Sequence, residues 1–353
     1  MSVPADVVAG VDLADSRGLE DAASFVVDLM ERPGSNVRVA EGQLDLLEDL
    51  VVDGHPDRFD LQPLTPAPSG TVWAVDGGSC VLADGRSFQV AATRAARVRF
   101  RDGVTDLSEA PPLQVTALSE DRIGGLYRER LERMGSPVPE ELPRIPRPVD
   151  FLRECQEWEE VRRTVGQASS GDVVLVDGSL HGGPFVPAEF VRRIHAEAVE
   201  RGVLLAGVVK ASTLFWGRNA PLVGLLKRRG DRELGRTMWS ARISTDPAFQ
   251  RLYVGEIFVA HLAATASHAF RVDVARGAGD PVEVLARLAG CSDDAAFAGY
   301  PYPLARAHRA ARVSGYAVAD LRRAFRGTLG RLGMSEDDIE TLFQDFHEVL
   351  NRS

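Results

Sequence analysis

Two aspartates, each followed by a glycine, stand where a short apolar segment of the sequence ends. Asp76 follows residues 71–75 and Asp177 follows residues 172–176, and both segments have the length and residue types of buried strands. An acid at the end of a parallel strand lies at the edge where open α/β sheets bind ligands. If the strands are neighbours, Asp76 and Asp177 can share a divalent cation such as Mg²⁺ or Mn²⁺, which prefers carboxylate oxygens. The alternative is a pair of unrelated Asp-Gly turns.

A third acid is expected from the helix predicted over residues 150–168, directly before the second strand. The apolar stripe of this helix runs through Phe151, Trp158, Val161, Val165 and Ala168. At about 100° per residue, Glu157 lies on the edge of this stripe and Glu154 lies within it. Glu159 and Glu160 point more toward solvent. Glu157 and Glu154 are therefore the better candidates for the third acid, and Glu160 stays as a further alternative.

The elements that must position these acids follow an α/β order. Strands are predicted over 71–75, 88–100, 172–176 and 203–209, the first two belonging to an antiparallel meander. Helices are predicted over 19–32, 41–53, 119–134, 150–168 and 187–201, and again over 303–312, 317–331 and 336–350. Strands that alternate with helices imply a sheet with parallel pairs. His261 and His268 are seven residues apart in a segment with helical spacing, and we expect surface or packing roles for them.

The composition is that of a folded globular protein. The 353 residues include 44% hydrophobic and 26% charged residues. No apolar run reaches the roughly 18 residues that cross a bilayer, and the N-terminus lacks the pattern of a signal peptide. The three cysteines are far apart and have no metal-binding spacing. These features predict a cytoplasmic protein with reduced cysteines and no contact with a membrane.

Charge is distributed unevenly along the chain. Residues 1–70 hold fourteen acids and four arginines, which equals the whole net charge of −10. Residues 201–242 hold nine bases and two acids, and three of the bases are consecutive: Lys227, Arg228 and Arg229. This basic segment is a candidate surface for nucleic-acid phosphates, and a solvated helix face is the alternative.

Six blocks of sequence, in order, resemble the NurA family of nucleases. They are Ala74-Val75-Asp76-Gly77-Gly78-Ser79, Leu152-Arg153 with Glu157-Trp158, Val176-Asp177-Gly178-Ser179-Leu180, Val208-Val209-Lys210-Ala211-Ser212, Phe270-Arg271-Val272-Asp273, and residues 299–308 from Gly299 to His308. The resemblance covers about residues 70–315. One departure is that the family's usual Asp-Gly-Ser of the first block is Asp-Gly-Gly-Ser here.

The resemblance implies a ribonuclease H-like α/β fold, in which helices flank a mixed sheet. It divides the chain into an acidic helical arm over 1–70, a nuclease domain over 71–315 and C-terminal helices over 316–353 that pack on the same domain. The implied activity is manganese-dependent cleavage of DNA single strands and DNA ends, with magnesium as the alternative metal and two ions expected. The implied partners are DNA, a second copy of the chain in a homodimer, and the hexameric ATPase HerA, during end resection in double-strand break repair.

The resemblance also implies roles for individual residues. Carried over by position, the metal ligands are Asp76, Glu157, Asp177 and Asp273. Lys210 would offset phosphoryl charge, and His308 would donate a proton or contact the scissile phosphate. The residues expected to contact DNA are Lys210, Arg271, Tyr300, Lys227, Arg228 and Arg229, among which Tyr300 would stack on a base or orient the phosphate. These roles fit phosphodiester hydrolysis, which needs an activated water and a stabilised leaving oxygen.

Two other classes of protein remain open from the sequence. Actin-like ATPases and sugar kinases share this type of fold and also place Asp-Gly turns on two strands. The sequence shows no later Gly-Gly adenosine loop, and Glu157 has no evident task in a kinase. A non-catalytic scaffold of the same fold is the third reading, and it is disfavoured because all the expected acidic positions are filled.

Overall fold

The fold is described from a computed structural model of the chain. It describes residues 15–31, 58–85, 87–141, 143–183, 185–212, 214–216, 220–243, 253–277 and 279–343. The predicted helix over 41–53 lies outside the described residues. None of the helices in the described part is both long enough and apolar enough to span a bilayer.

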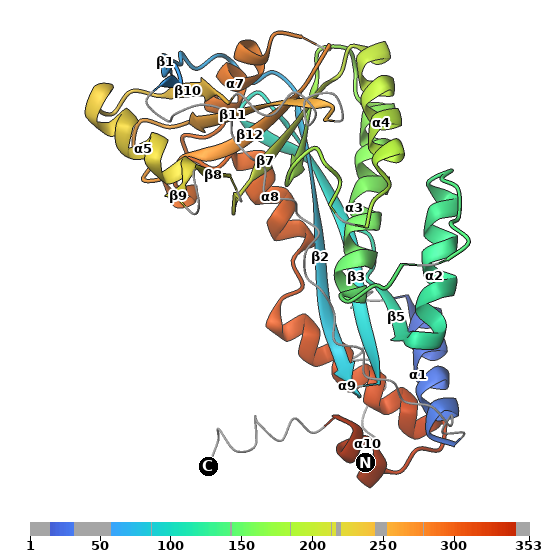
Figure 1. Cartoon of the computed structure of the whole chain (residues 1–353). Helices are drawn as coiled ribbons and strands as arrows, with labels where there is room; N and C mark the ends of the chain where they lie inside the picture. Colours follow the sequence, from blue (N-terminus) through green and yellow to red (C-terminus); the bar gives the residue numbers. More distant parts are fainter. Residues whose placement is uncertain are drawn as a thin grey trace.

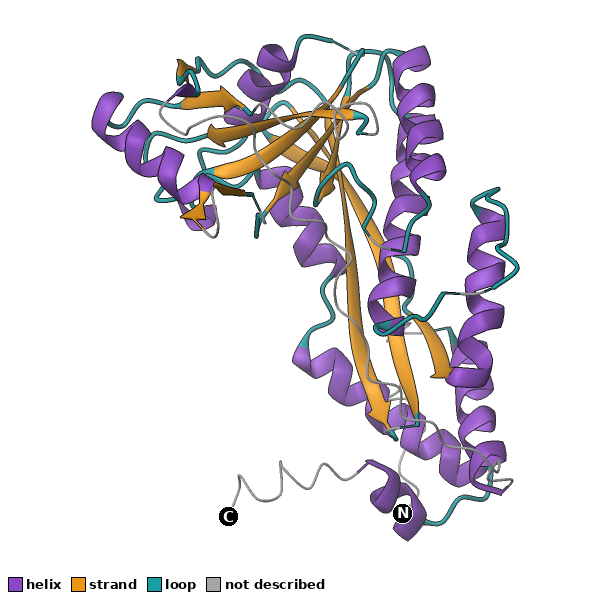
Figure 2. Ribbon diagram, in the orientation of Figure 1, coloured by secondary structure: helices purple, strands orange, loops and turns teal. Residues whose placement is uncertain are grey.

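Helices and strands follow one another along the whole described chain (Figures 1 and 2). The helices are α1 (Ser16–Glu31), α2 (Glu120–Arg133), α3 (Pro148–Gln167), α4 (Ala188–Arg201), α5 (Leu222–Glu233), α7 (Pro281–Ala289), α8 (Tyr302–Ala311), α9 (Gly315–Arg331) and α10 (Glu336–Phe343). The strands are β1 (Gln62–Pro63), β2 (Val72–Asp84), β3 (Phe88–Arg101), β4 (Val104–Glu109), β5 (Gln114–Ser119), β6 (Val173–Asp177), β7 (Leu204–Val209), β8 (Phe215–Trp216), β9 (Ala220–Pro221), β10 (Trp239–Arg242), β11 (Gly255–His261) and β12 (Phe270–Ala275).

A single ten-stranded sheet organises the molecule. Its order is β1-β10-β11-β12-β7-β6-β2-β3-β4, and β5 pairs with β3 beside this path. The pairs β2–β6 and β6–β7 are parallel, and the other pairs along the path are antiparallel. The parallel pairs are the ones joined by helical connections, as expected for crossovers between parallel strands.

Helices cover both faces of the central strands, and the pattern of β2 shows how. Trp73 and Val75 belong to the apolar cluster of α3 and α4, whereas Val72 and Ala74 belong to the cluster of α7 and α8. Successive side chains of a strand point to opposite faces, so this alternation buries both sides of β2. A strand buried on both sides shows a continuous apolar run, which is why its sequence predicts it well.

The β2–β3 pair extends far beyond the central strands as a long arm, and β5 pairs with β3 at the far end of this arm (Figure 1). Its far end has a separate apolar cluster, to which α1, β5, α9 and α10 contribute. In α1, Val26 is fully buried in this cluster, and Phe25 packs edge-on against Phe88 of β3 with ring centroids 6.3 Å apart. The apolar side of α1 therefore packs on the rest of the chain.

Two sequence-based expectations about strands were wrong. The first strand does not stop at Asp76, because β2 runs on to Asp84 as part of the arm. Segment 255–275, where His261 and His268 suggested helical spacing, forms β11, a loop and β12 instead. Both strands are buried on both faces and so lack the alternation that identifies a strand. The predicted helices over 19–32, 119–134, 150–168, 187–201, 303–312 and 317–331 are confirmed within one to three residues.

Candidate active site

Asp76 and Asp177 lie side by side because β2 and β6 are parallel and in register. The last paired residues are Val75 and Val176, so the next residue of each strand is the aspartate. Asp177 is the last residue of β6, while β2 continues past Asp76 with β3 as its neighbour. Asp76 is thus at the carboxyl edge of the parallel part of the sheet, although it is inside its own strand. The expected juxtaposition of the two acids is confirmed.

His308 completes this cluster. It comes from α8, which packs on the face of the sheet formed by Val72 and Ala74 of β2. Its Nδ1 lies 2.6 Å from Oδ2 of Asp76. One ligand atom from each of Asp76, Asp177 and His308 falls within 4.8 Å of the others. Two carboxylates at this spacing fit a hard divalent cation such as Mn²⁺, and the imidazole beside them can serve either as a further ligand or as a proton donor. The oxygen and nitrogen atoms that these three side chains offer are therefore suitable ligands for a divalent metal ion.

The electrostatics of the two carboxylates support the same conclusion. Asp76 is 4% exposed. Burial, followed by the negative charge of Asp177, raises the pKa of Asp76 to about 6, although Lys210 and His308 oppose the shift. Two carboxylates this close repel each other, and a proton or a cation between them relieves the repulsion. A bound divalent ion would remove this repulsion.

Lys210 and Tyr300 both contact Asp177. The ammonium of Lys210, which follows β7, donates to Oδ2 of Asp177 and lies 3.5 Å from Nδ1 of His308. The hydroxyl of Tyr300 donates to Oδ1 of Asp177 at 3.0 Å. The side chains of Lys210 and His308 are 42% and 52% exposed, whereas that of Asp177 is 10% exposed. The acids are thus at the bottom of the site and the two basic groups are at its rim.

Tyr300 is placed where it can orient a carboxylate but has little surface to offer a base. Its side chain is buried, its ring packs edge-on against Phe270, and Lys210 lies over the ring at 5.3 Å from the centroid. Burial and the charge of Asp177 raise the pKa of Tyr300 well above its ordinary value. The hydroxyl therefore stays protonated and donates a hydrogen bond to Asp177. Of the two roles expected for Tyr300, stacking on a base does not fit this packing.

Glu157 approaches from α3, on the opposite face of the sheet. It is 3% exposed, and Arg153, one turn earlier, donates to its Oε2 at 3.1 Å. Burial and the charge of Asp76 raise the pKa of Glu157 well above its ordinary value, and Asp177 contributes in the same direction. Its carboxylate lies outside the group of atoms formed by the two aspartates and His308. The structure therefore brings Glu157 close to both aspartates without making it a member of that group.

The other acids of α3 have different neighbours. Glu160 is paired with Arg97 at 3.2 Å, and Glu159 is paired with Arg130 at 3.0 Å. Both arginines come from other elements, β3 and α2, so these acids attach α3 to its surroundings rather than face the aspartates. Glu154 pairs with Arg153 at 3.5 Å. Burial raises the pKa of Glu154 to about 7.

The two glycines after Asp76 allow both helices to approach β2. A Cβ atom on Gly77 would lie 2.9 Å from Oε2 of Glu157 and 2.9 Å from Cγ of Arg153. A Cβ atom on Gly78 would overlap the carbonyl oxygen of Ala311, at the end of α8. The second glycine, which departs from the family pattern, thus makes room for the helix that carries His308.

Asp273 is held by a network of its own. Arg271 donates from Nε to Oδ1 at 2.8 Å and from a terminal nitrogen to Oδ2 at 3.0 Å, and the hydroxyl of Tyr253 donates to Oδ2. The backbone N–H of Leu180 also donates to Oδ2 at 3.2 Å. Both oxygens of this fully buried carboxylate therefore have partners within the protein. This arrangement fixes the loop after Asp177, and it argues against the predicted roles of Asp273 as a fourth ligand and of Arg271 as a DNA contact.

A comparison with protein families identifies the chain. The sequence profile of the NurA domain matches residues 70–313. The chain belongs to the NurA family. No curated protein matches it at a significant level.

Solved structures of low sequence identity resemble this NurA-family chain. The NurA nuclease from Sulfolobus solfataricus is 18% identical, with a TM-score of 0.49 and coverage of 78% of this chain and 89% of that one. A second NurA structure is 9% identical, with a TM-score of 0.47 and coverage of 92% and 99%. The catalytic domain of human endonuclease V is 16% identical, with a TM-score of 0.36 and coverage of 76% and 91%.

The strand order of this NurA-family chain confirms the predicted fold class. The strands β4-β3-β2-β6-β7 form three antiparallel neighbours followed by two parallel ones. This is the order of the ribonuclease H-like core, with β12, β11, β10 and β1 added at the β7 edge. The site lies where β2, β6 and β7 meet.

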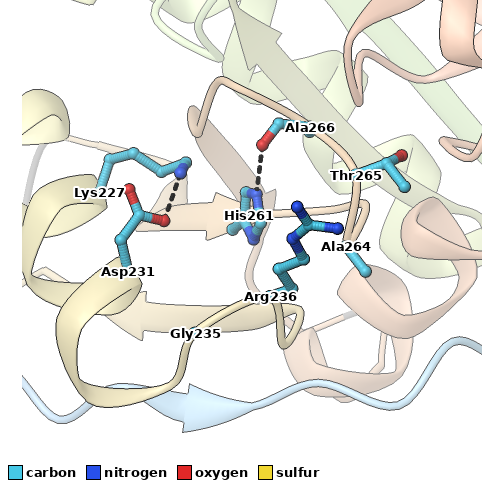
Figure 3. A pocket seen from close by; sticks show the side chains of 8 residues that line it. All are labelled: Lys227, Asp231, Gly235, Arg236, His261, Ala264, Thr265 and Ala266. Carbon is cyan, nitrogen blue, oxygen red and sulfur yellow. Dashed lines mark hydrogen bonds and ion pairs between the residues drawn. The ribbon is translucent and has the colours of Figure 1, made fainter.

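The basic residues of α5 lie on a different part of the NurA-family chain, and two of them are already paired. Lys227 pairs with Asp231 at 2.5 Å, Arg229 pairs with Glu233 at 2.8 Å, and Arg228 is exposed. Lys227 and Asp231 also line a pocket of about 270 Å³, together with His261 (Figure 3). The buried ring of His261 lies between the carbonyl oxygens of Thr237 and Ala266, at 3.2 and 2.9 Å, so its role is packing, as expected.

Sequence reasoning missed Arg153 and Tyr253 as residues of the site region. Arg153 was visible only as part of a family block, although its spacing of four residues from Glu157 on one helix face predicts the ion pair. Tyr253 precedes β11 and had no motif around it, so no sequence signal connected it to Asp273.

Proposed function

We propose that this chain is a metal-dependent DNA nuclease that cleaves single strands and DNA ends. The observation that carries the proposal is the cluster of Asp76, Asp177 and His308 within 4.8 Å, with the buried carboxylate of Glu157 beside it. A group of buried acids with basic groups at its rim suits a reaction in which a phosphodiester is attacked by water. Membership of the NurA family supports the same activity.

Asp76, Asp177 and Glu157 would hold the metal, which we propose to be Mn²⁺, with Mg²⁺ as the alternative and two ions in the complete site. When bound, such ions supply an activated water and stabilise the leaving oxygen. The protein's own part is to hold three carboxylates close together in spite of their repulsion. Tyr300 contributes to this by fixing one oxygen of Asp177 with its hydroxyl.

Lys210 and His308 are the groups that would meet the substrate. Both are partly exposed, and both lie within hydrogen-bond reach of the buried acids. Lys210 would offset the charge of the phosphoryl group, and His308 would donate a proton or contact the scissile phosphate. Arg271 is buried against Asp273, so we do not place it on the substrate.

Binding of the DNA strand would use the basic segment of α5 and the exposed arginines beside His308. Arg228 is exposed on α5, and Arg309 and Arg312 are exposed on or next to α8. Because the chain carries a net charge of −10, strand capture would depend on such local bases rather than on overall charge. Lys227 and Arg229 would contribute less, since each has an acidic partner one turn away.

Family membership extends the proposal to partners. The chain would form a homodimer and work with a HerA-type hexameric ATPase in resecting DNA ends during double-strand break repair, in the cytoplasm. Analytical ultracentrifugation of the chain alone, and of the chain with a HerA-type ATPase, tests both partners. A monomer that does not co-sediment with the ATPase would contradict this part of the proposal.

The activity is tested with end-labelled single-stranded and blunt duplex DNA. We expect cleavage with Mn²⁺ that is lost in EDTA and in Asp177→Asn, and that is retained in Asp320→Asn, a change at an exposed aspartate paired with Arg323. The same samples are assayed for hydrolysis of ATP. Cleavage that persists in Asp177→Asn, or ATP hydrolysis without DNA cleavage, would overturn the proposed function.

A further inference from the structure

Arg153 contacts the one acid of the site that comes from a helix. Its guanidinium donates to Oε2 of Glu157 at 3.1 Å and lies 3.5 Å from Oε1 of Glu154. The side chain of Arg153 is 27% exposed, and that of Glu157 is 5% exposed. The guanidinium therefore connects the buried carboxylate to the more open side of α3.

The Arg153–Glu157 pair packs directly against β2, the strand that carries Asp76. A Cβ atom on Gly77 would lie 2.9 Å from Cγ of Arg153 and 2.9 Å from Oε2 of Glu157. The absence of a side chain at this residue is thus what gives the ion pair its place next to Asp76. A glutamate has three rotatable side-chain bonds, so its carboxylate needs such a fixed support to stay in one position.

Each aspartate of the site has supports of the same kind. Asp177 is held by Tyr300 and Lys210, and Asp76 is held by His308. In the ion pair with Arg153, only Oε2 of Glu157 is the acceptor, which leaves Oε1 for another partner. Partners that orient a carboxylate in this way are what tune the affinity of a site for its metal.

We propose that Arg153 is a positioning residue that fixes the carboxylate of Glu157 for metal binding, and that Gly77 provides the space for this pair. The inference rests on the proposed function, because it takes Glu157 to be a metal ligand. Arg153 acts through Glu157 and has no contact with the reacting atoms. Because Glu157 is buried, removing Arg153 also removes the partner of a buried carboxylate, so the free energy of unfolding of each variant is measured beside its Mn²⁺ affinity.

The test is the affinity of the whole protein for Mn²⁺, measured by calorimetry and by the EPR signal of free Mn²⁺. We expect Arg153→Met to weaken Mn²⁺ binding about 10- to 100-fold, as for other partners of metal ligands. Arg153→Lys, which keeps the charge, should recover part of this loss. Arg163→Met is the matched control, because Arg163 pairs with Glu160 on the same helix and is 56% exposed. Its Mn²⁺ affinity should equal that of the wild type.

Gly77→Ala provides a second test that keeps every charge. The added methyl group displaces the pair, so Mn²⁺ binding should weaken in this variant as well. Unchanged or tighter Mn²⁺ binding in both Arg153→Met and Gly77→Ala would overturn the inference, since it would mean that Arg153 is neutral toward the metal or competes with it. If the wild-type protein itself binds no Mn²⁺, or if Asp76→Asn binds it as well as the wild type does, the proposed function fails instead.

Discussion

Replacing Asp76 by asparagine should make the metal-free protein more stable at pH 8 and leave its stability unchanged at pH 4. Asp76 is buried, and its pKa is raised from 3.8 to about 6, with burial as the largest cause. The folded state therefore favours the protonated form of this acid. Asparagine resembles that form and carries no charge at any pH.

The size and sign of the effect follow from linkage between protonation and folding. A shift of roughly 2 pKa units corresponds to about 3 kcal/mol at most, at 1.36 kcal/mol per unit. Because the folded-state pKa is higher, the wild type loses this stability as the pH rises from about 4 to about 6, and the loss is complete above that range. The free energy of unfolding of Asp76→Asn should exceed that of the wild type by up to about 3 kcal/mol at pH 8.

The assay is urea unfolding in EDTA at pH 4 and pH 8, with Asp320→Asn as the control at an exposed position. Adding Mn²⁺ at pH 8 should then stabilise the wild type, by about 2.7 kcal/mol at one hundred times the dissociation constant, and leave the variant unchanged. An Asp76→Asn variant that is no more stable than the wild type at pH 8 would contradict this prediction. A gain of equal size at pH 4 would refute it too.

Three further predictions follow from the site and its surroundings. Glu157→Gln should reduce DNA cleavage by more than about 100-fold, because even changes to the partners of a metal ligand cost about 10- to 100-fold. Glu160→Gln should retain most activity, and equal losses of initial rate in the two variants would contradict this prediction. His308→Ala should lower kcat by about 100-fold or more if the imidazole is a proton donor, and a smaller change would exclude that role. Changing the three bases at 227–229 to glutamate should weaken the binding of single-stranded DNA. The slope of the logarithm of the binding constant against the logarithm of the salt concentration should become shallower by up to about 2. An unchanged slope in fluorescence anisotropy titrations would show that α5 does not contact DNA.

Much of the central fold and of the site was predictable because the determining signals are local. The apolar segments before Asp76 and Asp177 identify two buried strands, and their parallel pairing brings the acids together without further information. The register of Glu157 on α3 follows from the apolar stripe of that helix. The family blocks then supplied Lys210, Tyr300 and His308, which are far along the chain from Asp76 and have no local pattern that identifies them.

What the sequence did not reveal depends on long-range packing. The continuation of β2 to Asp84 depends on pairing with β3, and β11 and β12 are buried on both faces, so neither shows a period of two. Asp273 follows the family pattern of a site acid, but its oxygens are engaged by Arg271, Tyr253 and Leu180, which only the folded chain brings together. The division of the chain at residues 70 and 315 stays a prediction.

The metal site at Asp76 and Asp177 is tested most directly by a crystal of the protein soaked in Mn²⁺ and measured at the manganese absorption edge. We expect an anomalous peak between Asp76 and Asp177, close to His308 and Glu157. A saturating soak that leaves no anomalous peak between these two aspartates, or that places the ion elsewhere in the molecule, would contradict the proposed metal site.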